Sequence, residues 1–279
     1  MKKIILSLFL GILSLFTFAS CAKSNTKVIS VCASELPHAD ILNNVCKEEL
    51  KQKGYELNVK TLDWTIQNSS VASKDYDANY FQHIPYLESS DQKDELVAIC
   101  KVHYEPLGIY YGKSKKELKD GKSFEICSDT SNAIRALELL KTKGVINELP
   151  INEEKNELTF NSSWTDGNVT ITLIDEQLLV ASMNDYDFAL LPCNTAYTGK
   201  ITSERLVAKE DDSTLVSLKA NILAARLKDY QNDLDYKAKI DALADVLLSK
   251  KVADYVKEKY LGNITCDESS QIDLRKNIK

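Results

Sequence analysis

The sequence predicts an α/β protein, and three observations support this prediction. The chain has 279 residues, of which 44% are hydrophobic and 27% are charged, as in ordinary soluble globular proteins. Short apolar runs typical of buried strands recur along it, and segments with the three-to-four-residue apolar spacing of helices lie between them. Strands that alternate with helices in this way favour mostly parallel sheets covered by helices. The length suffices for one large or two medium domains.

The elements are predicted in chain order from these two patterns. Strands are expected at 27–33, 57–62, 95–104, 108–111, 123–127, 169–174, 188–191 and 218–227. Helices are expected at 38–54, 64–74, 131–143, 176–183 and 234–260. Gly54 and Gly144 each follow a predicted helix, where glycine commonly ends one. The polar segment 147–166 is predicted to be a loop, and 266–279 to be a loosely held polar end.

The first residues have the pattern of a bacterial lipoprotein signal. Two lysines precede an apolar run at 4–18, and small residues lead directly to Cys21. The run is shorter than the ~18–20 residues needed to cross a bilayer. We therefore predict a signal peptide at 1–20, a lipid (palmitate among the acyl groups) on Cys21, a tether at 21–26, and a protein that works outside the cytoplasm. An ordinary signal peptide with a coincidental cysteine is the alternative.

Composition and motifs exclude several classes of function. A net charge of −6 gives no basic surface for nucleic acid. The chain has no glycine-rich phosphate loop, GxSxG, HExxH or CxxC, so we predict that it is not an enzyme and has no cofactor. No two of the cysteines after Cys21 lie within four residues of each other, so no metal-binding or redox pair is predicted. An exported location permits disulfides, but the sequence does not pair these cysteines.

The three histidines provide the main alternative function. His38, His83 and His103 are widely spaced, and no two have the i, i+4 spacing of a helical metal motif. Together with an acidic side chain they could bind zinc, which would make the chain an extracytoplasmic metal-binding protein or hydrolase. Neutral, hydrogen-bonded imidazoles are the more common state. A surface adhesin or structural lipoprotein with an unused pocket is a third hypothesis.

Aromatic side chains are concentrated at 77–86, with Trp64 a little upstream. Rings at strand ends and in loops suit a pocket for a small, partly apolar ligand. Tyr80 and Phe81 are neighbours, so in an extended segment their side chains point to opposite faces. We therefore predict that Phe81 faces the pocket and that Tyr80 lies in the core.

Four blocks of sequence resemble the methionine-binding lipoproteins of ABC importers, the NlpA family. They are DANYFQHIPYL at 77–87, KVHYEPLGIYY at 101–111, DTSNAIRALELL at 129–140 and LPCNTAY at 191–197. The resemblance implies a type II periplasmic-binding-protein fold, in which two α/β lobes are joined by two crossing strands and the ligand lies in the central cleft. With that fold we expect lobe 1 at 27–107 plus 222–279 and lobe 2 at 108–221.

The resemblance also implies function and partners. The chain would capture L-methionine, or a closely related apolar amino acid, and deliver it to the permease and ATPase of an ABC importer. It would act as a monomer, held at the cell membrane or outer membrane by the lipid on Cys21.

The polar end of the expected site must hold a buried zwitterion. A carboxylate is best held by a charge-assisted, bidentate donor, and arginine is the suited residue. Arg135 is the candidate, because it lies near the start of a predicted helix, whose N-terminus favours an anion. The resemblance implies the same role for Arg135 and assigns Asn194, which follows a buried strand, to the ligand. It places a second amide at Asn221, with Ser217 as a rival.

The resemblance assigns the aromatic wall around the thioether to Phe81, His83, Tyr86 and Trp64, and sulfur packs well against rings. Trp64 stands where tyrosine is commoner in the family. The pairs at 129–130 and 133–134 also depart from the family pattern, close to the expected carboxylate end. These departures leave open another apolar amino acid or a small peptide as ligand.

Overall fold

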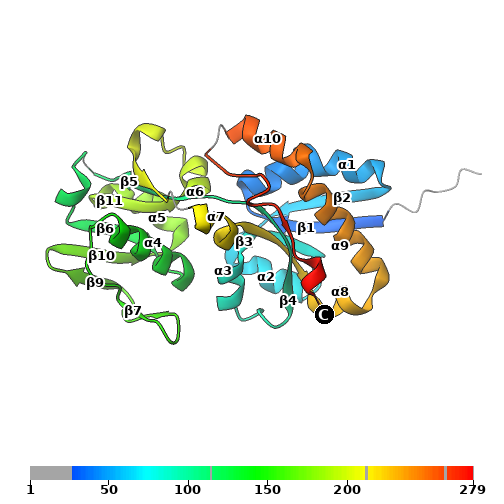
Figure 1. The fold of residues 1–279 in the computed structure, drawn as a ribbon, viewed down its shortest axis with the longest axis horizontal. Helices are drawn as coiled ribbons and strands as arrows, with labels where there is room; N and C mark the ends of the chain where they lie inside the picture. Colours follow the sequence, from blue (N-terminus) through cyan, green and yellow to red (C-terminus); the bar gives the residue numbers. More distant parts are fainter. Residues whose placement is uncertain (1–26, 114, 211–212, 261–262, 279) are drawn as a thin grey trace, which may run out of the picture.

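The computed structural model describes residues 27–113, 115–210, 213–260 and 263–278. In this part of the chain, two six-stranded sheets with helices packed against them form two lobes (Figure 1). The predicted signal peptide, Cys21 and the tether lie outside the described residues. Within those residues, every helix is too short or too polar to cross a bilayer.

The first sheet has the strand order β14-β4-β13-β3-β1-β2. Its strands in chain order are β1 (Lys27–Ala33), β2 (Tyr55–Thr61), β3 (Ala78–His83), β4 (Leu96–His103), β13 (Asn221–Arg226) and β14 (Ile272–Asp273). β1 pairs in parallel with β2 and β3, whereas β13 runs antiparallel between β3 and β4. Every residue of β3 and β13 is buried, as expected of strands in the middle of a sheet.

The second sheet has the order β12-β5-β11-β6-β10-β9. Its strands are β5 (Leu107–Tyr111), β6 (Ser123–Cys127), β9 (Ser163–Asp166), β10 (Val169–Ile174), β11 (Phe188–Pro192) and β12 (Leu206–Lys209). β6 is parallel to β10 and β11, whereas β5 is antiparallel to β11 and β12. The prediction of mostly parallel sheets is therefore wrong. The chain enters β5 and β13 from the other lobe, and both run antiparallel to their neighbours.

The chain crosses between the sheets twice, from His103 to Leu107 and again from Lys209 to Asn221. The second crossing contains α7 (Ser213–Lys219). This arrangement confirms the predicted fold of two α/β lobes with two crossings. Asn221 opens a strand of the first sheet and Leu107 opens a strand of the second, while the exact lobe boundaries stay a prediction.

The remaining helices pack around the two sheets (Figure 1). They are α1 (Lys47–Gln52), α2 (Trp64–Ala72), α3 (Ile84–Ser89), α4 (Thr130–Thr142), α5 (Glu176–Ser182), α6 (Cys193–Thr198), α8 (Leu227–Asn232), α9 (Leu234–Leu247) and α10 (Lys250–Tyr260). Two π-helical segments, Glu35–Ala39 and Leu42–Cys46, precede α1 and complete the helical stretch predicted at 38–54. Gly54 and Gly144 adopt positive φ angles of 83° and 70° just after α1 and α4, which confirms the predicted helix ends.

Three helices that border the space between the lobes begin in the same way. Asp63, Asp129 and Asp175 cap α2, α4 and α5, and each carboxylate accepts a backbone N–H of the first turn. Such caps satisfy donors that the helix itself leaves free. Local sequence therefore fixes where these helices begin.

Three further predictions are wrong in detail. The strand predicted at 218–227 begins only at Asn221, because Leu218 belongs to α7 and its side chain is 58% exposed. The helix predicted at 234–260 breaks at 248–249, between α9 and α10. The predicted loop 147–166 contains β9 and a small ribbon of β7 (Ile151–Asn152) and β8 (Glu157–Leu158), whose apolar side chains pack on the second lobe.

The chain end at 266–278 is also held more firmly than predicted. β14 pairs with β4, and Cys266 and Ser270 are buried against Val102. The cysteines within the described residues are all free thiols. Tyr80 is fully buried in the core of the first lobe, which confirms its predicted placement.

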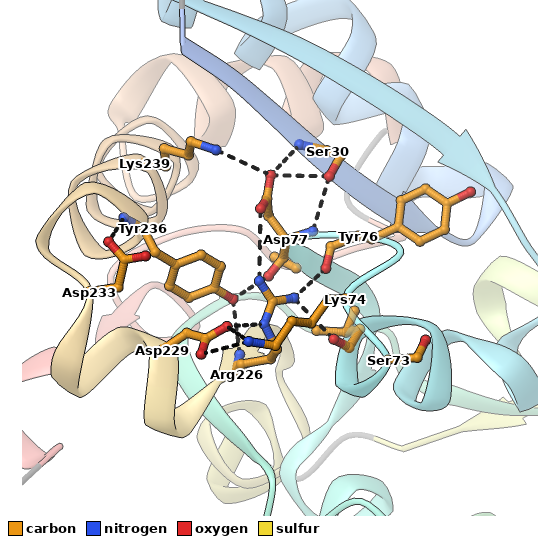
Figure 2. A network of polar contacts seen from close by, with 12 residues as sticks. Ser30, Ser73, Lys74, Tyr76, Asp77, Arg226, Asp229, Asp233, Tyr236 and Lys239 are labelled. Carbon is orange, nitrogen blue, oxygen red and sulfur yellow. Dashed lines mark hydrogen bonds and ion pairs between the residues drawn. The ribbon is translucent and has the colours of Figure 1, made fainter.

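A buried network around Arg226 ties the outer end of β13 to the rest of the first lobe (Figure 2). The guanidinium of Arg226 donates to the carbonyl oxygens of Val71 and Tyr76 at 3.0 and 2.5 Å, and to Asp229 at 2.6 Å. Its Cζ lies 4.5 Å from the ring centroid of Tyr236. Five residues of extended chain place this network roughly 17 Å from Asn221, at the other end of β13.

We expect Arg226→Ala to lower the free energy of unfolding by about 3 kcal/mol, because several buried acceptors lose a charged donor. Urea unfolding followed by circular dichroism measures this. Lys74→Ala is the matched control, since Lys74 contacts the same Asp229 from the surface with 65% of its side chain exposed, and it should cost under about 1 kcal/mol. Equal losses for the two variants would contradict the prediction.

Candidate functional site

A cavity of about 580 Å³ lies between the lobes, and both lobes line it. All seven residues predicted to bind a ligand are in its wall: Trp64, Phe81, His83, Tyr86, Arg135, Asn194 and Asn221. Ser217, the rival to Asn221, is not among the described residues that line it. The structure thus brings together in one place residues that are up to 157 positions apart in the chain, from Trp64 to Asn221.

One part of the wall is aromatic. The ring centroids of Trp64 and Tyr86 are 5.0 Å apart, and those of Phe81 and Tyr86 are 5.6 Å apart at 78°. Trp64 is the first residue of α2, Phe81 lies in β3, and Tyr86 lies in the first turn of α3. These rings form an apolar surface against which a flexible side chain could pack.

His83 joins the aromatic wall to the opposite lobe. Its Nδ1 accepts the backbone N–H of Tyr86 at 3.2 Å, and its Nε2 lies 3.2 Å from Oδ1 of Asn132 in α4. The amide nitrogen of Asn132 donates to Asp129, so the amide oxygen faces His83 and Nε2–H is the donor. Burial, with a smaller effect of the Arg135 charge, lowers the pKa of His83 to about 3. His83 is therefore a neutral link between the lobes.

Arg135 lies in α4 and is 3% exposed. Its Nε donates to Glu210 at 2.7 Å, and its Nη2 donates to the second oxygen of Glu210 and, at 2.7 Å, to the carbonyl oxygen of Glu105. The bidentate edge expected for a ligand carboxylate is therefore occupied by Glu210. These bonds use Nε and Nη2 of the five N–H groups of the guanidinium. The Tyr104 hydroxyl also interacts with the guanidinium, and Nη1 makes no hydrogen bond to a carboxylate or carbonyl of the described residues.

Glu210 was not predicted, because nothing in the local sequence around it indicates a site. It follows β12 and also accepts the hydroxyl of Tyr104 at 2.7 Å and the backbone N–H of Leu107 at 2.8 Å. Burial alone would raise the pKa of Glu210, but the hydrogen bonds and charge of Arg135 outweigh burial and hold that pKa below its usual value. Glu210 is therefore ionised and neutralises the buried guanidinium.

A second buried cluster contains two of the three histidines. Nε2 of His103 lies 2.7 Å from Oε1 of Glu105, and its Nδ1 is hydrogen-bonded to the hydroxyl of Tyr80. Nε2 of His38 lies 3.0 Å from Oδ1 of Asn221 and 3.7 Å from Oε1 of Glu105. Burial lowers the pKa of His38 to about 4 and of His103 to about 3, and it raises the pKa of Glu105 to about 7.

This cluster bears on the predicted zinc alternative. His38, His103 and Glu105 each offer a ligand atom within 4.8 Å of the others, but His83 makes its contacts elsewhere, with Tyr86 and Asn132. Both ring nitrogens of His103 already have hydrogen-bond partners. The three histidines therefore do not meet at one point, as the zinc alternative requires.

Other polar groups complete the wall. Asn194 lies in the first turn of α6, and its Oδ1 is buried without a partner among the described residues. Glu176 accepts the hydroxyl of Thr195 at 2.8 Å, and burial raises the pKa of Glu176 to about 7. Gln177 donates to Asp63 of the other lobe at 2.5 Å. Neither Glu176 nor Glu105 was predicted as a site residue, although Glu105 lies inside the block 101–111 that carries the family resemblance.

Two α/β lobes that enclose a cavity, each contributing side chains to its wall, define a substrate-binding protein of the periplasmic-binding-protein fold. A family model described as NlpA lipoprotein matches residues 29–266. The chain therefore belongs to the NlpA lipoprotein family, as its sequence blocks predict.

Similar proteins agree with this assignment. The methionine-binding lipoprotein MetQ of Bacillus subtilis is 34% identical over 277 residues, which cover 95% of this chain and 98% of MetQ. Lipoprotein Tp32 of Treponema pallidum has a similar structure, with a TM-score of 0.75 at 26% identity, covering 86% of this chain and 99% of Tp32. The structure of a nutrient-binding protein of Burkholderia cenocepacia bound to methionine has a TM-score of 0.73 at 27% identity, covering 86% of this chain and 99% of that protein.

The ion pair of Arg135 and Glu210 generates a stability prediction. Glu210→Met leaves a buried guanidinium without its partner and should lower the free energy of unfolding by about 3–5 kcal/mol. Adding Arg135→Met removes that unpaired charge, so the double variant should be more stable than Glu210→Met alone. Guanidinium chloride unfolding measures both.

Glu204→Met is the matched control, because Glu204 is exposed in the same segment; it should change stability by under about 0.5 kcal/mol. Strictly additive losses in the double variant would show that the two side chains do not stabilise each other.

Proposed function

We propose that this protein is an extracytoplasmic binding protein that captures L-methionine, or a closely related apolar amino acid, in the cleft between its lobes. It would deliver this ligand to the permease and ATPase of an ABC importer. The relatives named above support the proposal: one is named as methionine-binding and another has a structure bound to methionine. The family is one of substrate-binding lipoproteins and not of enzymes.

The observation that carries the proposal is the pairing of two chemistries in one cavity. Arg135, Asn194 and Asn221 supply charged and amide groups, and Trp64, Phe81 and Tyr86 supply rings. A free amino acid with an apolar tail has the same two halves. Nη1 of Arg135 would bind its carboxylate as a charge-assisted donor, while the side chain packs against the rings beside His83.

The unpartnered Oδ1 of Asn194 adds to this support. A buried acceptor without a donor costs about 1–3 kcal/mol, and the ammonium group of a ligand would remove that penalty. The hydrogen bonds from Gln177 to Asp63 and from His83 to Asn132 join the lobes at the cavity. In the proposed cycle these contacts form when the lobes, 27–107 plus 222–279 and 108–221, close on the ligand.

Membrane attachment belongs to the same proposal. The relatives are lipoproteins, and one is named a membrane lipoprotein. We infer that Cys21 carries the lipid and that the protein is a monomer tethered at the outer surface of the cell membrane or at the outer membrane.

Calorimetry should show one L-methionine bound per chain, and L-methionine should raise the melting temperature in a screen of amino acids, because a ligand that binds only the folded state stabilises it. Asn194→Ala should weaken binding about 10- to 100-fold through loss of a buried hydrogen bond to a charged group. The exposed Asn168 lies in the turn between β9 and β10, so Asn168→Ala should bind normally. Wild-type protein that binds no amino acid would overturn the proposal.

Cys21→Ala should move the full chain from the membrane fraction to the soluble exported fraction. Mass spectrometry of the wild-type protein should find acyl groups on Cys21. Cys266→Ala, which removes a cysteine buried in the first lobe, should leave the chain in the membrane fraction. Equal membrane retention of the Cys21→Ala variant would exclude this anchor.

A further inference from the structure

Glu105 is a buried carboxylate in the cavity wall with one oxygen still available. It lies in the first crossing between the lobes and is 4% exposed. Oε1 takes the contacts with His103 and His38. Oε2 makes no hydrogen bond with any described residue, and it is not among the enclosed polar atoms that lack partners. Oε2 of Glu105 is therefore a free hydrogen-bond acceptor at the cavity.

The hydrogen bonds of His103 hold Glu105 in this orientation. A neutral imidazole has one donor and one acceptor nitrogen. Burial raises the pKa of Glu105 to about 7, and an ammonium group bound beside it would favour its ionised form. In that form Glu105 can only accept, so Nε2–H of His103 donates to it at 2.7 Å. Nδ1 is then the acceptor for the hydroxyl of Tyr80. These hydrogen bonds link Tyr80 in the core of the first lobe, through His103, to Glu105 at the cavity, and they fix the orientation of the Glu105 carboxylate.

His38 acts on Asn221 in a complementary way. Its Nε2 lies 3.0 Å from the amide oxygen of Asn221, which can only accept, so Nε2–H donates. The amide nitrogen of Asn221 is left without a partner among the described residues. The two buried histidines thus leave the cavity with an acceptor on Glu105 and a donor on Asn221.

The free atoms of the wall then match a zwitterion. The free donors include Nη1 of Arg135 and Nδ2 of Asn221, and Nε1 of Trp64 is a further unpartnered donor in the wall. The free acceptors include Oε2 of Glu105 and Oδ1 of Asn194. The carbonyl oxygen of Glu105 accepts from Arg135 at 2.7 Å, so the carboxylate and guanidinium of these two residues lie on neighbouring parts of the wall. An α-amino acid carries a carboxylate and an ammonium group on the same carbon, so neighbouring parts of the wall could bind both groups.

Glu176 also lines the cavity, but its oxygens are less available. Oε1 accepts the hydroxyl of Thr195, and Oε2 lies 4.0 Å from Sγ of Cys127. We propose that Glu105, positioned by His103, binds the α-ammonium group of the ligand and makes the site specific for amino acids with a free amine. This inference rests on the proposed function and names the group that recognises one half of the ligand.

The test compares two ligands by calorimetry on the full chain. One is L-methionine, and the other is 4-(methylsulfanyl)butanoate, which lacks only the amine. The wild-type protein should bind the second at least about 100-fold more weakly. Glu105→Gln should weaken L-methionine binding about 10- to 100-fold, as for loss of a hydrogen bond between charged groups. The same variant should leave the affinity for the amine-free ligand unchanged or higher.

Glu125→Gln is the matched control. Glu125 is fully buried in β6, contacts Ser182 and does not line the cavity, so the variant should bind both ligands as the wild-type protein does. His103→Gln should weaken L-methionine binding by a smaller factor and spare the amine-free ligand. If Glu105→Gln does not fold, Glu105→Asp serves instead, because it keeps the charge but withdraws it from the cavity. This variant should weaken binding of L-methionine and leave binding of the amine-free ligand unchanged.

The outcomes separate the two proposals. Equal losses for both ligands in the Glu105 variants would show a purely structural role and overturn this inference. Equal affinity of the wild-type protein for both ligands would overturn it as well. Wild-type protein that binds no amino acid would instead reject the proposed function.

Discussion

The buried ion pair of Arg135 and Glu210 is the interaction on which the arrangement around the cavity depends. Glu210 lies at the start of the second crossing, and the carbonyl of Glu105, to which Arg135 also donates, lies in the first. One guanidinium in α4 therefore binds both connections between the lobes. A ligand carboxylate at Nη1 of Arg135 would lie beside the two segments that connect the lobes.

The same ion pair explains how the wall of the cavity can contain a buried charge without destabilising the fold. An isolated buried charge is strongly destabilising, whereas a paired and fully hydrogen-bonded one is tolerated. Arg135 is neutralised by Glu210, and Glu210 itself accepts from Tyr104 and Leu107. Because His38, His83 and His103 stay neutral, they orient amide and carboxylate groups without adding charge.

Local sequence predicted the parts of the site that depend on one segment. Alternation in β3 placed Tyr80 in the core and Phe81 in the cavity, because side chains of a strand alternate between its faces. The position of Arg135 near a helix start followed from the apolar spacing that predicts a helix at 131–143. Where register depends on partners, prediction failed: the strand containing Asn221 began three residues later than expected, and sheets predicted as mostly parallel are mixed.

The sequence by itself indicated the α/β class, and its resemblance to the NlpA family gave the family, the two-lobed fold and seven of the residues that line the cavity. The α/β class follows from local periodicity, and the rest follows from sequence blocks that can each be read within one segment. Only the tertiary structure decided that Glu210, 75 positions from Arg135, occupies its bidentate edge, and that His103 and His38 meet at Glu105. Such contacts depend on strand order and on where the chain crosses between the sheets, and no local pattern encodes the distance between residues that far apart.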